Sequence, residues 1–352
     1  MRRHAGLPWV GAAVLALAGS AAVGAAAGAT GGSPASGPAG GQEAWVATGA
    51  FDAEPGNTVT GVDLATHRVD QEVTTGSQPV AMAVVDGGRT VLVVNRGVDT
   101  LSVVDAATGS VTATVRVGMQ PDAVAYVPGG TGHHAVALVA NFGGDTVTPV
   151  DLSTLRAGNA IPVGKQPDAI GVWAPAAGSG GGRGVAVVAN FGDGTVTPIN
   201  LATMTAGVAV STGTEPDAVG IVPPGPAGGP TALVADFGTD TVIPVDVATM
   251  ADGPAVGLGG NPTGISVSAN TAWVVGGNTL TPVSASGGPS FAAGTPVTLP
   301  GLGQAVAVTG STAWVALQAG NLVPVSLPSG TVGRAVHVGG RPSAVVISRS
   351  SS

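Results

Sequence analysis

Residues 137–152 read ALVANFGGDTVTPVDL, and two later stretches repeat this pattern almost letter for letter. Residues 186–201 read AVVANFGDGTVTPINL, and residues 232–247 read ALVADFGTDTVIPVDV. A shorter segment precedes each copy and reads QPDAV, QPDAI or EPDAV. Weaker copies fill most of the remaining chain, so that one unit recurs at intervals of 39 to 49 residues. Valine-rich runs between Gly, Pro, Asn and Asp clusters predict short strands joined by turns.

Each unit divides into four such strands, which we call a to d. In the clearest unit, strand a covers 122–127, strand b 137–141, strand c 145–152 and strand d 160–164. A repeat of four short strands with this period is typical of a β-propeller blade. The insertions that lengthen some units fall between strands a and b, where a hairpin tip tolerates extra residues.

The two ends of the repeat array complement each other. The first unit opens at residues 44–47, which match strand b, and the last unit contains only a strand a at 342–347. A C-terminal strand that completes the first blade would leave the ring without an open seam. We therefore predict an all-β fold, a seven-bladed β-propeller of four-stranded antiparallel blades. The N-terminal b, c and d strands and the C-terminal a strand would together close it.

Proline occupies one position of strand c in most units. Five of the seven copies carry it, at Pro149, Pro198, Pro244, Pro282 and Pro324. Because proline lacks the N–H that a central strand needs, we expect strand d to be short or bulged opposite this position.

Composition narrows the range of functions. The chain has no cysteine, which excludes disulfides, thiolate metal sites and a cysteine nucleophile. The net charge is −8, and removal of Arg2 and Arg3 would leave 10 basic against 20 acidic residues, a charge of −10. We expect no binding to nucleic acid, because an acidic domain repels it.

The N-terminus has the layout of a secretory signal peptide. Arg2 and Arg3 precede an apolar stretch over about 10–29, which ends in Ala27-Gly28-Ala29. We predict a signal peptide at 1–29, a Gly/Ser/Pro linker at 30–41, the propeller at 42–349 and a tail at 350–352. An uncleaved membrane anchor is the alternative, since the stretch is about long enough to span a bilayer. We expect a secreted, extracellular or cell-envelope location, with membrane contact only through an uncleaved N-terminal segment.

The repeat resembles the YVTN-type β-propeller family. The motif V-A-N-x-G-x-D-T-V-x-x-V-D carries the resemblance, with Val93-Val94-Asn95, Val139-Ala140-Asn141 and Val188-Ala189-Asn190 at the segment that names the family. The similarity extends from Gln42 to about Ser348. It implies an exported binding or surface-layer protein, and related seven-bladed propellers include lactonases and a streptogramin lyase. The strand-c prolines depart from the β-branched residue of the typical repeat.

The residue after the Pro or Gly that opens strand a provides the first candidate site. Strand a should be innermost, so this residue should lie at the mouth of the central channel. The polar candidates are Asp122, Asp168, Asp217, Thr263, Gln304 and Ser343, and Val80 fills the same position once. Three neighbouring aspartates could bind Ca²⁺, Mg²⁺ or a cationic ligand. Alternatively, each aspartate could cap its own turn.

The turn between strands b and c provides the second candidate set, on the same face. We predict a ligand rim there for a glycan or peptide, and the alternative is packing between blades. Its residues are Asn95, Arg96, Asn141, Phe142, Asn190, Phe191, Asp236 and Phe237. No histidine or arginine is evident as a partner of the three acids, and the sequence contains no recognisable catalytic motif.

We therefore expect a secreted, non-enzymatic binding scaffold for a protein, glycan or small molecule. The alternative is a lactonase-type propeller hydrolase in which Asp122, Asp168 and Asp217 hold a divalent cation as a Lewis acid. We expect no required cofactor, with Ca²⁺ or Mg²⁺ as the open option, and a monomer.

Overall fold

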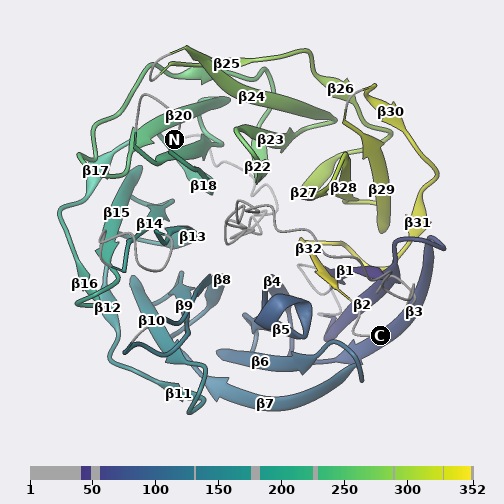
Figure 1. Ribbon diagram of the computed structural model, residues 1–352, viewed down its shortest axis with the longest axis horizontal. Coiled ribbons are helices and arrows are strands. Elements are labelled where there is room, and N and C mark those ends of the chain that lie inside the picture. The colour runs from purple at the N-terminus through teal and green to yellow at the C-terminus, as the bar shows by residue number, and fades with distance from the viewer. Residues whose placement is uncertain are drawn as a thin grey trace, which may run out of the picture.

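The chain forms a ring of seven antiparallel sheets in the computed structural model, which describes residues 41–48, 56–130, 132–175, 183–224, 229–287, 290–327 and 329–349 (Figure 1). This confirms the predicted all-β, seven-bladed propeller. The predicted signal peptide at 1–29, residues 30–40 of the linker and the tail at 350–352 lie outside the described residues. A search of the described ranges finds no helix with the length and apolar character needed to cross a bilayer.

The strands of each blade follow one another from the centre of the ring outward. Blade 1 contains β32 (Ala344–Arg349), β1 (Gln42–Ala47), β2 (Thr58–Asp63) and β3 (Arg68–Thr74). Blade 2 contains β4 (Pro79–Val85), β5 (Thr90–Asn95), β6 (Thr100–Asp105) and β7 (Ser110–Arg116), with a single 3₁₀ turn at Asp86–Gly88. Blade 3 contains β8 (Pro121–Val127), β9 (Val136–Asn141), β10 (Thr146–Asp151), β11 (Arg156–Ala157) and β12 (Ile161–Pro162).

The other four blades keep the same order. Blade 4 contains β13 (Pro167–Trp173), β14 (Val185–Asn190), β15 (Thr195–Asn200), β16 (Thr205–Ala206) and β17 (Val210–Ser211). Blade 5 contains β18 (Pro216–Val222), β19 (Thr231–Asp236), β20 (Thr241–Asp246) and β21 (Val256–Gly257). Blade 6 contains β22 (Pro262–Ser268), β23 (Thr271–Gly276), β24 (Thr279–Gly287), β25 (Ser290–Ala293) and β26 (Val297–Thr298). Blade 7 contains β27 (Gly303–Thr309), β28 (Thr312–Leu317), β29 (Asn321–Ser326), β30 (Thr331–Val332) and β31 (Val336–His337).

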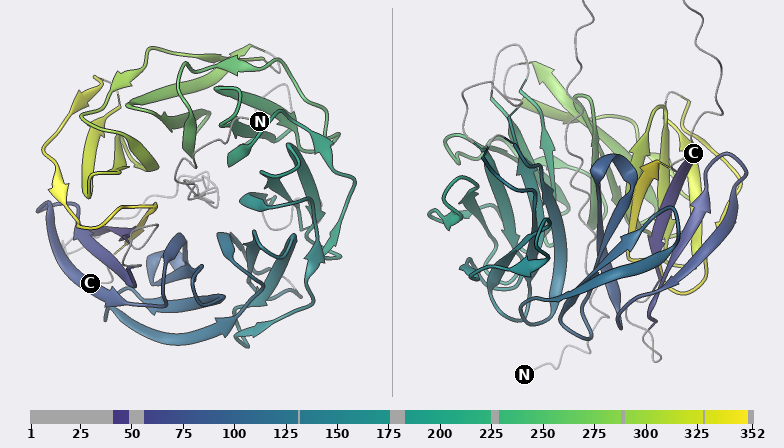
Figure 2. Two further views of the ribbon diagram at one scale, coloured as in Figure 1. Left: turned by 180° about the vertical axis from the view of Figure 1, so that it is seen from behind. Right: turned by 60° about the horizontal axis from the view of Figure 1, so that its bottom comes forward.

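The ring closes through blade 1, as the sequence predicts. Strand β32 pairs with β1 from Gln42↔Arg349 to Ala47↔Ala344. The buried Trp45 donates its indole N–H to Ser348 Oγ at 3.0 Å across this pairing. Figure 2 shows the yellow C-terminal strand beside the purple N-terminal strand. The two ends of the chain thus share one sheet, and the pairing covers the inner edge of the N-terminal strand.

The hydrophobic core lies between the blades rather than at the centre of the ring. Side chains alternate along strand b, so that Leu92 and Val94 pack toward blade 3 while Val91 and Val93 pack toward blade 1. The same alternation produces clusters at the junctions of neighbouring blades. Both faces of the middle strands are therefore buried, which explains the runs of Val, Leu and Ala.

The strand-c prolines interrupt the outer strand, as predicted. In blade 3, strand β10 pairs with β11 at Val150↔Ala157 and with β12 at Val147↔Ile161, and no ladder pair forms with either at Pro149. The carbonyl of Pro149 instead accepts the N–H of Gly158 at 2.7 Å. This carbonyl points to the outer strand, and the N–H of a strand residue points to the same side as its carbonyl. The missing N–H of proline is therefore lost from the c–d ladder only, and the b–c ladder stays intact.

Candidate functional site

A β-bulge opens the innermost strand of six blades. In blade 3, Pro121 pairs with Asn141 and Ala123 pairs with Ala140, so that Asp122 is the extra residue between them. The same register shift isolates one residue in each of the other five blades: Val80, Asp168, Asp217, Thr263 and Gln304. A bulge redirects a side chain that regular alternation would place in a blade face. The candidate position in these six blades is thus a bulge residue, a feature that the sequence did not reveal.

The hydroxyl residues at this position fasten neighbouring blades. Thr263 Oγ1 donates to the carbonyl of Gly303 in blade 7 at 3.2 Å, and Ser343 Oγ of blade 1 donates to the carbonyl of Pro79 in blade 2 at 3.2 Å. Both side chains are buried. Gln304 is half-buried and donates to the carbonyl of Gly303 beside it. These three candidates are occupied by structural hydrogen bonds.

The three aspartates behave differently from the hydroxyl residues. Asp122 is 1% exposed, and Asp168 and Asp217 are 0% exposed. Apart from a protonated carboxyl of the cluster itself, no hydrogen-bond donor among the described residues reaches either oxygen of Asp168 or Asp217. The alternative that each aspartate caps its own turn therefore does not describe these two side chains. They interact with each other and with Asp122, and carboxyls bond each other only when one carries a proton.

Burial and mutual repulsion hold protons on this cluster. Burial is the largest cause that raises the pKa of Asp168 well above its usual value, and the charges of Asp122 and Asp217 raise it further. Burial raises the pKa of Asp217 to about 8, with contributions from the charges of Asp122 and Glu215. Burial also raises the pKa of Asp122, although the Arg96 guanidinium acts against this change.

Arg96 supplies the one ion pair that the described residues contain. It lies in the turn after β5 of blade 2, and its Nη1 donates to Asp122 Oδ2 of blade 3. Its guanidinium also lies over the Phe142 ring, with Cζ 4.8 Å from the ring centroid. The expectation that the acids lack an arginine partner was therefore wrong for Asp122. The Arg96–Asp122 pair would be found from the sequence by comparing the b–c turn of each blade with strand a of the next blade, rather than with strand a of the same blade.

The asparagines of the predicted rim are fully buried. Asn141 Oδ1 accepts the N–H of Gly118 at 3.0 Å, and its amide donates to Thr146 and Thr148. Asn95 and Asn190 bond the matching residues of strand c, and Asp236 accepts the N–H of Thr214 at 2.8 Å. These four side chains tie the turns of their own blades. Phe142 is buried and Phe191 and Phe237 are half-buried at the adjoining position.

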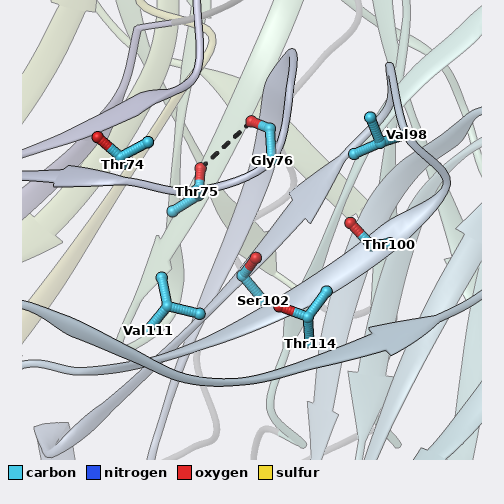
Figure 3. Close-up of a pocket in the computed structure, with 8 residues that line it drawn as sticks. All are labelled: Thr74, Thr75, Gly76, Val98, Thr100, Ser102, Val111 and Thr114. Carbon is cyan, nitrogen blue, oxygen red and sulfur yellow. Dashed lines mark hydrogen bonds between the residues drawn. The ribbon is translucent and has the colours of Figure 1, made fainter.

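A separate cavity of about 260 Å³ lies between blades 1 and 2. Figure 3 shows its lining, which is Thr74, Thr75, Gly76, Val98, Thr100, Ser102, Val111 and Thr114. These residues carry five hydroxyl groups and no charged side chain. Two of those hydroxyls, on Thr100 and Ser102, already accept hydrogen bonds from the Asn95 amide. This cavity is distinct from the aspartate cluster, which belongs to blades 3 to 5.

The described residues contain no group of three His, Cys, Asp or Glu side chains placed to hold a metal ion. The aspartate cluster is thus a set of buried, interacting acids with one guanidinium at its end. Such a cluster can store protons, or it can bind a cation that takes their place.

Comparisons with known proteins find the fold but no relative in sequence. No family model matches the chain, and no curated protein matches its sequence. A functionally unknown protein from Desulfotomaculum acetoxidans is 15% identical, with a TM-score of 0.69 over 88% of this chain and 99% of that one. A putative 6-phosphogluconolactonase from Bacteroides uniformis is 15% identical, with a TM-score of 0.66 over 87% and 99%. Kuenenia stuttgartiensis hydrazine synthase is 19% identical, with a TM-score of 0.62 over 80% and 89%. The chain is thus a seven-bladed β-propeller whose structural neighbours include proteins of the lactonase type.

Proposed function

We propose that this protein is an exported, non-enzymatic binding scaffold. Its ligand or protein partner docks on the face formed by the strand-a bulges and the b–c turns. The observation that carries this proposal is the pair Asp168 and Asp217, which are fully buried and have no hydrogen-bond donor among the described residues except the carboxyls of their own cluster. The buried hydroxyl residues at the same position of other blades bond a backbone carbonyl, as Thr263 and Ser343 do. Buried acids whose pKa values are raised, as those of Asp168 and Asp217 are, cluster at functional sites.

Thermal denaturation of the purified full-length chain tests this proposal. The panel contains CaCl₂, MgCl₂, neutral oligosaccharides, lactones, and neutral and cationic amines. A ligand that binds only the folded state must raise the melting midpoint. We expect at least one class to raise the midpoint of the wild type and to lose this effect in the Asp168→Asn/Asp217→Asn variant. Asp252→Asn, at an exposed position in blade 5, is the matched control.

Two results would contradict the scaffold proposal. In the first, no class shifts the midpoint at millimolar concentration. In the second, the double variant responds to every class as strongly as the wild type, which would move binding away from these acids.

A lactonase-type hydrolase is the second candidate. One observation favours it: Asp217, with a pKa of about 8, is a protonated acid at neutral pH and can serve as a general acid. The divalent cation of this hypothesis has no support in the geometry, because the described residues contain no three acidic side chains placed to hold a metal ion. A pH-stat assay with γ- and δ-lactones, with and without Mg²⁺ or Ca²⁺, tests this function. Turnover that disappears in Asp217→Asn supports a hydrolase, and hydrolysis at the uncatalysed rate rejects it.

Export is part of the proposal and has its own test. Residues 1–29 carry the basic, apolar and small-residue segments of a signal peptide. Mass spectrometry of the protein produced in its native host should find a chain that begins after Ala29. A chain that retains residues 1–29 and stays in the membrane fraction would instead support the anchor alternative.

A further inference from the structure

Arg96 and Asp122 provide an internal example of how this fold binds a cation. The guanidinium comes from the b–c turn of blade 2 and meets the bulge carboxyl of blade 3. It also stacks over Phe142, the aromatic residue in the b–c turn of that same blade. The Arg96 side chain is 12% exposed, whereas Asp122 is 1% exposed. A guanidinium therefore reaches a buried bulge carboxyl from this face and gains a cation–π contact on the way.

The next two blades repeat the bulge carboxyl and the turn phenylalanine of this arrangement, without the arginine. Blade 4 carries Asp168 at its bulge and Phe191 at its turn, and blade 5 carries Asp217 and Phe237. The position of Arg96 is filled by Phe142 in blade 3 and by Phe191 in blade 4. A phenyl ring has no N–H to donate. Asp168 and Asp217 thus lack the guanidinium donor that Asp122 has, and only the protonated carboxyls of the cluster itself can donate to them.

We propose that Asp168 and Asp217 together bind one guanidinium or alkylammonium group of an organic cation, as Asp122 binds the guanidinium of Arg96. This inference rests on the proposed function and names the ligand class. A planar guanidinium has five N–H donors in a fork that can bridge two adjacent carboxyls. Its ring-stacking face matches a site flanked by aromatic turns, a contact that a bare metal ion cannot make in the same way.

The charges around the two carboxyls agree with a single cation. Arg96 neutralises Asp122, and Asp168 and Asp217 interact with each other, with Glu215 as a further charged neighbour of Asp217. In the free protein these two carboxyls avoid repulsion by holding protons. A bound cation takes over that role, so the carboxyls ionise and protons leave. Binding should therefore release protons at neutral pH and strengthen as the pH rises toward 8.

We infer entry past the b–c turns of blades 4 and 5, as Arg96 reaches Asp122 past the b–c turn of blade 3. The two carboxyls are closed to solvent, while Phe191 and Phe237 at these turns are half-buried. A small cation has the best chance of access, so the test uses methylguanidinium. N-methylurea, its neutral counterpart of the same shape, is the control ligand.

Isothermal titration calorimetry on the full-length chain tests the assignment. We expect methylguanidinium to bind the wild type and Asp252→Asn, and N-methylurea not to bind. Asp168→Asn and Asp217→Asn should each weaken binding about tenfold or more, because each removes a charge-assisted hydrogen bond. The heat of binding should differ between phosphate and Tris buffers in proportion to the protons released.

A second variant tests the internal example itself. Arg96→Ala removes the ion-pair partner of Asp122 and should lower the melting midpoint. Millimolar methylguanidinium should reverse part of this decrease, and N-methylurea should not. Circular dichroism confirms that the variants are folded. Equal responses to the charged and neutral ligands, or binding that survives both Asn substitutions, would overturn the cation assignment.

The two proposals fail in different ways. If CaCl₂ or a neutral ligand gives a shift that depends on Asp168 and methylguanidinium does not, the scaffold stands and the organic-cation assignment falls. If no member of the panel gives such a shift, both fall together.

Discussion

One backbone position explains most of the chemistry at the residue scale. The bulge residue is withdrawn from the ladder in six blades, so a polar side chain there must find a partner elsewhere, in the next blade for Thr263 and in its own blade for Gln304. Thr263 finds that partner in a carbonyl oxygen, and so does Ser343 at the matching position of blade 1. A carboxylate cannot, because it has no proton to donate. The three aspartates must therefore hold protons, pair with Arg96 or accept a cation from outside.

The raised pKa values predict that stability falls as the pH rises from about 4 to about 8. Asp217 and Glu43 have folded-state pKa values of about 8, against an unfolded value near 4. The folded protein binds these two protons more tightly than the unfolded chain does. The resulting stabilisation of the fold is complete below pH 4 and is lost as the pH rises through 8. Each buried group contributes at most about 1.4 kcal/mol per pH unit. Urea denaturation at pH 5, 6, 7 and 8 measures this slope.

Asp217→Asn should flatten the slope, because an amide does not titrate. Stability should also fall at low pH. Hydrogen bonds to the carboxylates of Asp63 and Asp105 lower their pKa values, and this stabilisation is lost when these groups are protonated. The stability maximum is thus expected at mildly acidic pH. A maximum at pH 8, or an unchanged slope in Asp217→Asn, would contradict the protonated cluster.

Gly61 leaves space for a buried carboxyl in blade 1. A Cβ at this position would overlap Glu43 Oε1 and would lie 2.9 Å from Gln71 Cγ. Glu43 is 3% exposed and accepts a hydrogen bond from Gln71 Nε2 at 2.8 Å. We predict that Gly61→Ala destabilises the fold by roughly 1–3 kcal/mol, because the added methyl overpacks this site. Chemical denaturation measures the change.

A double-mutant cycle separates this clash from a backbone effect. Glu43→Ala removes the side chain that the new methyl meets, so Gly61→Ala should cost much less in that background. Equal costs in both backgrounds would show that the carboxyl is not the reason for glycine.

The outer strand divides the blades into two kinds at the element scale. Blades 1 and 2 have Gly61 and Val103 in the proline column, and their outer strands β3 and β7 run for seven residues each. The five blades with proline have outer segments of two to four residues. Short edge strands present few unpaired backbone groups to other chains. The prolines therefore protect the outer edges of five blades from edge-to-edge pairing with other chains.

Val103→Pro should lower the free energy of unfolding more than Pro149→Val does. Val103 pairs with Ala113 of β7, and its carbonyl also accepts a hydrogen bond from Thr112 Oγ1 at 3.1 Å. Proline there removes a ladder donor and leaves its acceptor unmatched, which costs roughly 1–3 kcal/mol. Pro149→Val breaks no ladder and should cost no more than about 1 kcal/mol, through the unfolded state. Urea midpoints of the two variants decide this, and equal losses would refute the explanation.

Strand order, blade number and closure were predictable because each depends on local pattern. The proline column even predicted where strand d breaks. The bulges were not predictable, since QPDAV reads equally well as a regular strand. The Arg96–Asp122 pair depends on how far one blade's turn reaches toward the next, which no single repeat encodes. The burial of Asn95 and Asn141 was missed for a similar reason: turn asparagines are commonly exposed, and only packing of the connection above them buries these.

The seam in blade 1 holds the whole molecule together. Trp45 is fully buried, packs in the cluster that joins blades 7, 1 and 2, and bonds Ser348 of the last strand. We predict that Trp45→Ala lowers the free energy of unfolding by about 3–5 kcal/mol, as large core truncations do. Ser348→Ala removes only the hydrogen bond and should cost about 1 kcal/mol. Denaturant titration checks both, and similar losses would assign the seam's strength to the hydrogen bond rather than to packing.

Closure by the last strand also sets the order of events in folding. Trp45 and Ser348 are 303 residues apart in the chain. Bringing the ends of a flexible loop of that length together costs about 5 kcal/mol of entropy. The ring cannot close on the ribosome before β32 has emerged, so blade 1 should be the last blade to gain protection in pulsed hydrogen exchange. Until that final strand arrives, the chain has an open ring in which the inner edge of β1 is unpaired.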